Sequence, residues 1–153
     1  MKSKFTFLTF FLLGSLLFTE SCKKDTTETP ATNTKGISVS IDGTNWKTTT
    51  VTTTNSGTHF IISGIKANES VIISLVDLAV GTYPIDVSTN TAIFTNGNDF
   101  MTDIYSAISG EVEITSVNST GTEFDGKFNF ITINASKETK TFTSGTLTQI
   151  TIP

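Results

Sequence analysis

Apolar and polar residues alternate along several stretches of the chain. Ile37, Val39 and Ile41 alternate with serines, which is the pattern of a strand with one face in a core and the other in water. Asp42 and Gly43 follow directly, and both residue types accept the backbone conformation of a tight hairpin turn. We therefore expect the folded part of the chain to begin with a β-hairpin.

Strand-like stretches continue to the end of the chain, and none sustains an apolar pattern at helical spacing. They are rich in Thr, Ile, Val and Phe, which favour strands. The predicted strands are 37–41, 46–54, 58–66, 70–77, 81–85, 91–95, 100–107, 110–117, 123–134 and 139–152. About ten strands, spaced roughly 8 to 12 residues apart, predict an all-β domain that is an antiparallel β-sandwich or a partly open β-barrel.

Some strands have distinctive patterns. Residues 58–66 and 70–77 contain consecutive apolar residues, which predicts central strands buried on both faces. The Thr-rich stretch 46–54 is expected to be an edge strand or a solvent-facing strand. The strand that contains Pro84 is expected at an edge, or Pro84 marks the start of a strand, because proline has no N–H to donate to a neighbouring strand. The apolar positions of 123–134 change parity after Phe130, which predicts either a β-bulge near that residue or burial on both faces.

The beginning of the chain has a different pattern. Residues 5–18 are apolar with few interruptions and follow Lys2 and Lys4. This run of 14 residues is shorter than the roughly 20 that a membrane-spanning helix needs. A basic start followed by a short apolar core is typical of a secretory signal peptide, which we assign to residues 1–21.

Cys22 is the only cysteine of the chain, so it cannot form an intramolecular disulfide. It follows the small residue Ser21 at the end of the signal, and this arrangement resembles a bacterial lipobox. The resemblance implies cleavage before Cys22 and transfer of a diacylglycerol to its thiol. The alternative is an ordinary signal peptide cut elsewhere, with Cys22 incidental. Two or three acyl chains would hold the protein durably on a membrane.

The lipobox reading divides the chain into three parts and gives it a location. After the signal, residues 22–35 form a lipidated cysteine and a Thr-rich tether whose largest aliphatic residue is Ala31. Such a segment buries too little apolar surface to become ordered. Residues 36–153 are long enough for a single all-β domain with its own core. The expected location is the cell envelope, on the outer membrane, facing either the periplasm or the cell surface.

Charge narrows the range of partners. The net charge is −4, and all ten basic residues are lysines. Phosphate contacts need clustered cations, so we expect no nucleic-acid partner. The expected contact with a membrane is made through acylated Cys22, and the further partners that we consider are a glycan or another envelope protein.

Short motifs occur in a fixed order along the part that follows Cys22. They are IDGTNW, GTYPI, SGEVEIT, FDGKFNF and SGTL. With the lipobox before them, they resemble a family of small Bacteroidota-type lipoproteins of uncharacterised function that carry an all-β domain. The resemblance covers nearly the whole of this part of the chain. It implies a compact antiparallel barrel or sandwich tethered outside the inner membrane, and it implies no reaction.

Few residues are candidates for chemistry. His59 is the only histidine and has no cysteine nearby in sequence, so no metal site or cofactor is expected. Glu111 and Glu113 share one face of a strand. A carboxylate pair can hydrolyse glycosides, but these two occupy the polar positions of an alternation typical of a solvated face. Asp99 and Asp103, together with Asn96 and Asn98, have oxygen ligands suited to calcium, although such a sequence is also an ordinary turn.

Three aromatic residues could bind a ligand, namely Trp46, Tyr83 and Tyr105. Flat rings with a polar group can pack on an apolar surface and still form a hydrogen bond. The alternative role of all three is packing in the core.

Three functional hypotheses follow. The first is a lipid-anchored cell-envelope protein whose domain is a non-enzymatic binding or structural module. The second is a carbohydrate- or small-ligand-binding β-domain, which needs an exposed aromatic row or a lined pocket. The third is a hydrolase, which needs at least two of His59, Asp99, Asp103, Glu111 and Glu113 to converge in a cleft.

Overall fold

The computed structural model describes residues 34–99 and 102–153, and these residues form strands, turns and loops without a helix. The predicted signal peptide, Cys22 and residues 23–33 of the predicted tether lie outside the described residues. No helix long and apolar enough to cross a bilayer occurs among the described residues. The ten strands are β1 (Gly36–Ile41), β2 (Thr44–Thr48), β3 (Val51–Asn55), β4 (Phe60–Lys66), β5 (Glu69–Leu75), β6 (Gly81–Pro84), β7 (Thr91–Thr95), β8 (Ile104–Val117), β9 (Glu123–Ile133) and β10 (Thr139–Thr151). The predicted all-β class is confirmed.

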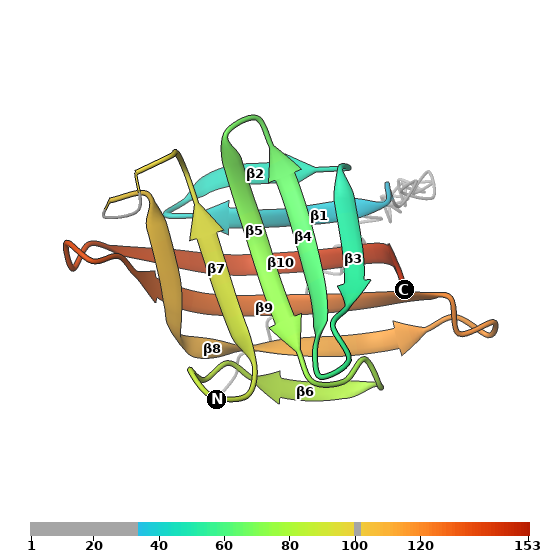
Figure 1. The fold of residues 1–153 in the computed structure, drawn as a ribbon. Helices are drawn as coiled ribbons and strands as arrows, with labels where there is room; N and C mark the ends of the chain where they lie inside the picture. Colours follow the sequence, from blue (N-terminus) through green and yellow to red (C-terminus); the bar gives the residue numbers. More distant parts are fainter. Residues whose placement is uncertain (1–33, 100–101) are drawn as a thin grey trace, which may run out of the picture. The chain divides into compact units, whose positions relative to one another are not determined.

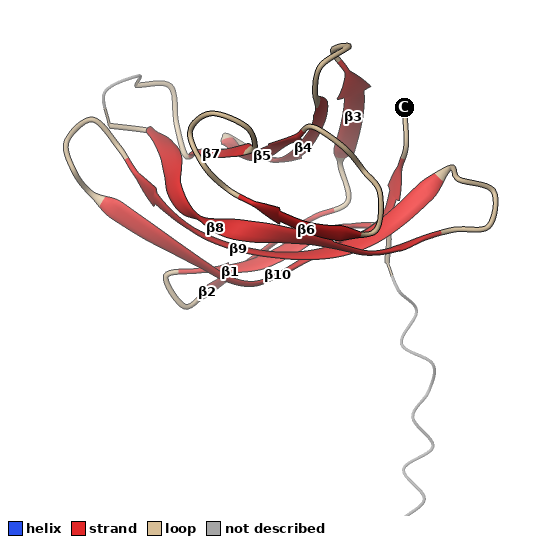
Figure 2. Ribbon diagram, turned by 90° about the horizontal axis from the view of Figure 1, so that it is seen from below, coloured by secondary structure: helices blue, strands red, loops and turns tan. Residues whose placement is uncertain are grey.

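All ten strands belong to one antiparallel sheet. Its order is β2-β1-β10-β9-β8-β7-β5-β4-β3, with β6 paired to β8 beside this path. The sheet is bent so strongly that β7, β5, β4 and β3 cross over β8, β9, β10 and β1 (Figure 1). Figure 2 shows the resulting two layers from a second direction. The domain is therefore a nearly closed, barrel-like sheet. The predicted partly open barrel describes its near closure, and the predicted sandwich describes its two layers.

The two edges of the sheet come close to each other. β2 lies against β4, and β3 lies against β10. The Thr48 hydroxyl donates a hydrogen bond to the carbonyl of Ile65 at 2.5 Å, and the Thr53 hydroxyl donates to the carbonyl of Thr151 at 2.7 Å. Side chains thus link each edge strand to an inner strand with which it forms no ladder, and the backbone N–H of Ile65 also donates to the carbonyl of Thr50 at 3.0 Å.

Several predictions at the strand level are confirmed. Ile37, Val39 and Ile41 face the core, and the hairpin turn has positive φ angles at Asp42 (49°) and Gly43 (82°). β3 is an edge strand, and β6, which ends at Pro84, pairs only with β8.

The prediction that 46–54 is one strand is wrong. The chain forms β2 and β3 instead, separated by Thr49 and Thr50, and the two strands lie at opposite edges of the sheet. The break allows the chain to pass from one layer to the other. The continuous threonine run hides it, because threonine suits a strand on either side of the break.

The prediction of separate strands 100–107 and 110–117 is also wrong. β8 includes the end of the first predicted strand, from Ile104, and the whole of the second. Its register with β9 shifts between Ala107 and Ser109, which marks a β-bulge. Gly110 has a φ of 141°, and a Cβ there would overlap the backbone of Asn129 and Phe130. Bulges bend a strand and increase its twist. β8 can therefore pair with β7 in one half and β6 in the other.

β9 contains no change of parity at Phe130. Its core-facing residues Phe128, Phe130 and Thr132 keep one phase, while Ile131 is 40% exposed on the other face. The irregularities lie instead in the partner strands, because both β8 and β10 shift register opposite this part of β9. The predicted bulge within β9 is therefore wrong.

The expectation of burial on both faces of β4 and β5 is wrong as well. Ile62, Val71 and Ile73 are fully buried on the inner face, but Ile61 and Ile72 on the outer face are only half-buried. The sheet encloses one core, and these outer positions remain partly exposed. Their isoleucines favour the strand conformation without being buried.

Aromatic rings form a continuous stack inside the sheet. Phe128 packs on Phe130, with ring centroids 5.3 Å apart, and Phe130 packs on Phe142 at 4.5 Å. Phe142 meets Phe94 at 5.4 Å, and Phe94 meets Tyr105 at 6.2 Å. Such pairs contribute about 0.5–1.5 kcal/mol each beyond the burial of their area. The stack links β7 and β8 with β9 and β10.

The two layers come into close contact at Gly64 in β4. A Cβ at this position would lie 2.8 Å from Ile37 Cδ1, 3.0 Å from Thr48 Cγ2 and 3.4 Å from Trp46 Cη2. These three residues belong to β1 and β2 in the opposite layer. The missing side chain of Gly64 therefore allows the layers to pack against each other.

We expect Gly64→Val to lower the free energy of unfolding by about 1–3 kcal/mol, because overpacking a tightly packed core forces its neighbours to move. Urea denaturation measures the change. Gly81→Val is the matched control, since its Cβ would meet nothing within 4 Å and Gly81 also lies in a strand. Equal effects of the two substitutions would show that the layers are not in close contact at Gly64.

Candidate functional site

The three aromatic candidates lie in different surroundings. Trp46 in β2 is 3% exposed and Tyr105 in β8 is 4% exposed, so both rings belong to the core. Tyr83 in β6 is half-buried. These rings therefore form no exposed row, and core packing describes Trp46 and Tyr105.

The polar group of each ring has a partner within the protein. Trp46 Nε1 donates a hydrogen bond to Glu69 Oε2 at 2.8 Å. The Tyr105 hydroxyl donates to Glu138 Oε2 at 3.1 Å, and the Tyr83 hydroxyl donates to the carbonyl of Ala79 at 2.7 Å. Each bond ties a ring to a neighbouring turn or strand end.

A cavity of about 250 Å³ opens beside Trp46. Buried side chains of Ile41, Trp46 and Phe94 contribute its apolar part. They come from the neighbouring strands β1 and β2 and from β7, which is far from both in the order of the sheet. The cavity therefore exists because the bend of the sheet brings these strands together.

The rest of the cavity is lined by polar residues at strand ends and turns. They are Asp42, Thr44, Asn45, Lys66, Glu69, Asn96 and Lys140. Asp42 is in the β1–β2 turn, Lys66 and Glu69 flank the β4–β5 turn, and Asn96 directly follows β7. We call the cavity formed by these polar residues and by Ile41, Trp46 and Phe94 the open-end cavity.

The charges around the open-end cavity are two ammonium groups and two carboxylates. Lys140 Nζ lies 3.8 Å from Asp42 Oδ2 and 4.9 Å from the centroid of the Tyr105 ring. Glu69 accepts the Trp46 indole N–H. Lys66 is opposite Glu69 in the β4–β5 pair, but it forms no ion pair or hydrogen bond with the described residues.

Several lining groups have hydrogen-bonding capacity that the protein does not use. The side-chain amides of Asn45 and Asn96 form no hydrogen bond with the described part of the chain. A side-chain amide can donate and accept, an ammonium group donates, and a carboxylate accepts. The arrangement can therefore bind a small polar molecule by several hydrogen bonds at once.

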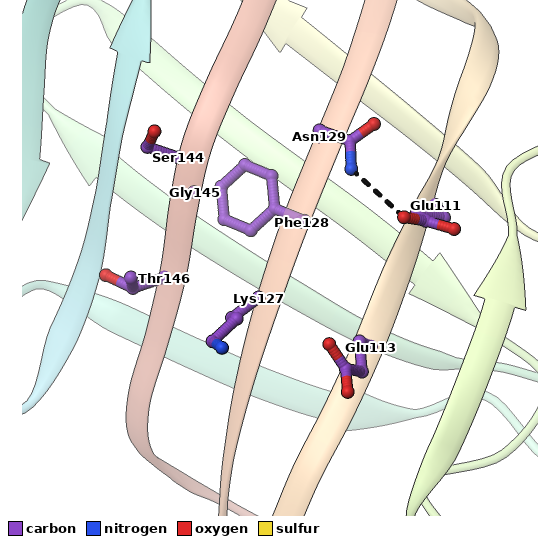
Figure 3. Close-up of a pocket in the computed structure, with 8 residues that line it drawn as sticks. All are labelled: Glu111, Glu113, Lys127, Phe128, Asn129, Ser144, Gly145 and Thr146. Carbon is purple, nitrogen blue, oxygen red and sulfur yellow. Dashed lines mark hydrogen bonds between the residues drawn. The ribbon is translucent and has the colours of Figure 1, made fainter.

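A second depression, of about 420 Å³, lies on the outer face of β8, β9 and β10. Glu111 and Glu113 are both exposed there, on one face of β8 (Figure 3), as the sequence predicts. Asn129 Nδ2 donates to Glu111 Oε1 at 3.3 Å, and Glu113 is in register with Lys127. This depression is formed by three neighbouring strands and includes the buried Phe128, whereas the open-end cavity joins strands that are distant in the order of the sheet.

The other titratable candidates lie elsewhere. His59, in the β3–β4 loop, has Nε2 at 3.0 Å from the carbonyl of Thr89. Asp103 Oδ2 accepts the backbone N–H of Asp99 at 2.8 Å in the β7–β8 loop. His59, Asp99 and Asp103 are not among the residues that line the outer depression with Glu111 and Glu113. Within the described ranges, no group of three or more His, Cys, Asp or Glu side chains is placed to hold a metal ion.

Sequence reasoning finds Trp46 but misses the residues around it. Glu69, Phe94 and Lys140 are 23, 48 and 94 positions away along the chain. No local motif connects these residues. A hint is present in Asn45, Glu69 and Asn96, polar residues in or next to predicted turns, and it becomes specific once the order of the strands is known.

Both tyrosines should titrate above the ordinary tyrosine pKa of about 10. Burial raises the pKa of Tyr105, and its hydrogen bond to Glu138 adds to this effect. Burial also raises the pKa of Tyr83, with a contribution from the carboxylate of Asp77. The chain has two tyrosines, so the ultraviolet absorbance of phenolate reports these two groups alone.

The protonated tyrosines are favoured in the folded state, so raising the pH above about 10 should lower stability as the unfolded chain loses its phenolic protons first. We expect the phenolate midpoint of the native protein to exceed that measured in denaturant, and Tyr105→Phe to remove part of the high-pH signal. Identical native and denatured midpoints would contradict the effect of partial burial and of the neighbouring carboxylates on these hydroxyl groups.

Comparison with known proteins places the domain in a family. The family described as "Domain of unknown function (DUF6252)" matches residues 33–151. No curated protein and no solved structure matches the chain. The family match extends over all ten strands and over more than half of the chain. The chain therefore belongs to the DUF6252 family.

Proposed function

We propose that this protein is a lipid-anchored protein of the cell envelope and that its β-domain is a non-enzymatic binding module. The anchor is supported by the sequence of residues 1–22, with its short apolar signal and the cysteine that follows Ser21. The binding role is supported by one observation, the open-end cavity, in which unused polar groups surround a buried apolar floor.

The proposed anchor and tether determine where the domain can act. The acyl chains on Cys22 sit in the outer membrane, and residues 23–35 connect them to β1. A fully extended chain spans at most about 3.5 Å per residue, so this tether reaches roughly 45 Å. The domain can therefore meet a partner well above the bilayer, in the periplasm or at the cell surface.

The cavity favours a binding role through its chemistry. The Glu69 carboxylate is already engaged by the buried indole of Trp46, and Lys140 is held between Asp42 and the Tyr105 ring. Groups fixed in this way bind a ligand without losing much conformational freedom. A glycan or another small polar ligand fits such a cavity, and an envelope protein that carries a polar group could use the same place.

Membrane attachment is tested by detergent partition of the protein made from its complete gene in a bacterial host that acylates lipoproteins. We expect the unchanged protein to enter the detergent phase and Cys22→Ala to remain in the aqueous phase, because the acyl chains are the proposed anchor. Labelling with a radioactive fatty acid should follow the same pattern.

Ser21→Ala is the matched control. It keeps a small residue before the cysteine, so labelling and partition should be unchanged. Cys22→Ala protein that remains in the detergent phase would overturn the proposed anchor and leave the binding role of the domain to be judged on its own test.

A further inference from the structure

We infer that the open-end cavity binds one ring of a neutral polyol, such as a single sugar residue of a glycan. This inference rests on the proposed binding function and adds to it the place and the class of ligand. It is drawn from the size of the cavity, the balance of its charges, its apolar floor and its unused hydrogen-bonding groups.

The size of the cavity limits the ligand to a small molecule. Its volume is about 250 Å³, slightly below the range of about 300–1,000 Å³ that is usual for drug-sized ligands. It equals the liquid volume of roughly eight water molecules. One six-membered ring with its hydroxyl groups fits this space, and further rings of a chain would extend into solvent.

The charges favour a neutral ligand. Lys66 and Lys140 contribute two positive charges, and Asp42 and Glu69 contribute two negative charges. An anionic ligand would be attracted by the two lysines and repelled by the two carboxylates, and a cationic ligand would experience the reverse. A neutral ligand meets no such repulsion and can use all four groups as hydrogen-bond partners.

The floor and the wall match the two kinds of surface on a sugar ring. Trp46 and Phe94, which are 3% and 2% exposed, close the floor of the cavity with apolar atoms, and the C–H groups of a ring can lie against these atoms without stacking on an exposed ring face. The amides of Asn45 and Asn96 can each donate and accept, as hydroxyl groups do. Lys66 adds a donor that has no partner in the described part of the protein.

The cavity is also prepared for binding before a ligand arrives. The bond of 2.8 Å from Trp46 Nε1 to Glu69 Oε2 fixes one carboxylate oxygen and leaves Oε1 to accept a bond from a ligand. Lys140 is held by Asp42 and the Tyr105 ring. Because these donors and acceptors are fixed in position, the hydroxyl groups of a ligand can form hydrogen bonds with them in place of the water molecules that the ligand displaces.

Trp46 provides a direct measurement because it is the only tryptophan of the chain. The experiment uses the acylated protein in micelles of a polyoxyethylene detergent, which has no sugar in its headgroup. Glucose, galactose, mannose, xylose, rhamnose and N-acetylglucosamine are titrated while tryptophan fluorescence is recorded. Glucuronate and glucosamine are the negatively and positively charged comparisons.

We expect at least one neutral sugar to change the fluorescence in a saturable way. The Kd should be about millimolar, because a ligand of this size offers few atoms for contact. Glucuronate and glucosamine should bind at least about tenfold more weakly than the best neutral sugar. Thermal melting should rise in the same order.

The site is tested with variants that leave the core unchanged. Asn45→Ala combined with Asn96→Ala removes both amides and should weaken binding by about tenfold or more, because each lost hydrogen bond contributes a sizeable part of that factor. Glu69→Gln keeps an oxygen for the indole N–H but removes the negative charge, so the preference against glucuronate should shrink. Glu113→Gln, exposed on the outer face of β8, is the control and should bind like the unchanged protein.

Each contrary outcome overturns a definite part of the inference. If no sugar changes the fluorescence or the melting temperature, the ligand is not a polyol. If a charged sugar binds more tightly than every neutral one, the ligand class is wrong while the binding function stands. If the double asparagine variant binds as well as the unchanged protein, the site is wrong. The detergent-partition result for Cys22→Ala is independent of all three.

Discussion

The close approach of β4 to β1 and β2 is the constraint on which the rest of this structure depends. Gly64 leaves room for Ile37, Thr48 and Trp46 to lie against its backbone. This contact brings the two layers of one bent sheet together and nearly closes it. Because Trp46 is part of the same contact, the packing that stabilises the domain also sets the floor of the open-end cavity.

The bend itself comes from irregularities in the longest strands. β8 shifts register beside Gly110, and β10 shifts between Phe142 and Gly145. A regular pair of long strands would continue in one direction, whereas bulges turn and twist it. β8 therefore pairs with β7 in one layer and with β9 in the other. The aromatic stack from Phe128 to Phe94 fills the space between them.

The local pattern of the sequence predicts most strands, since alternation and turn residues are local properties. Prediction from the local pattern fails where one residue type is compatible with two different local structures. Gly110 marks a bulge inside β8, although glycine is equally typical of a turn between two strands. The threonines of 46–54 hide the break between β2 and β3. Ile131 breaks the parity of its strand because an outer sheet face tolerates an exposed isoleucine.

The candidate site is less predictable, because it depends on the order of the strands. Trp46 is recognisable as an amphipathic ring, but its bond to Glu69 and its place beside Phe94 follow from the closure of the sheet. The contact between Gly64 and Trp46 is therefore the claim to test most directly, by nuclear Overhauser effects in solution. The account predicts strong effects between the α protons of Gly64 and the indole protons of Trp46. Their absence, in a protein whose β4–β5 hairpin is otherwise formed, would contradict it.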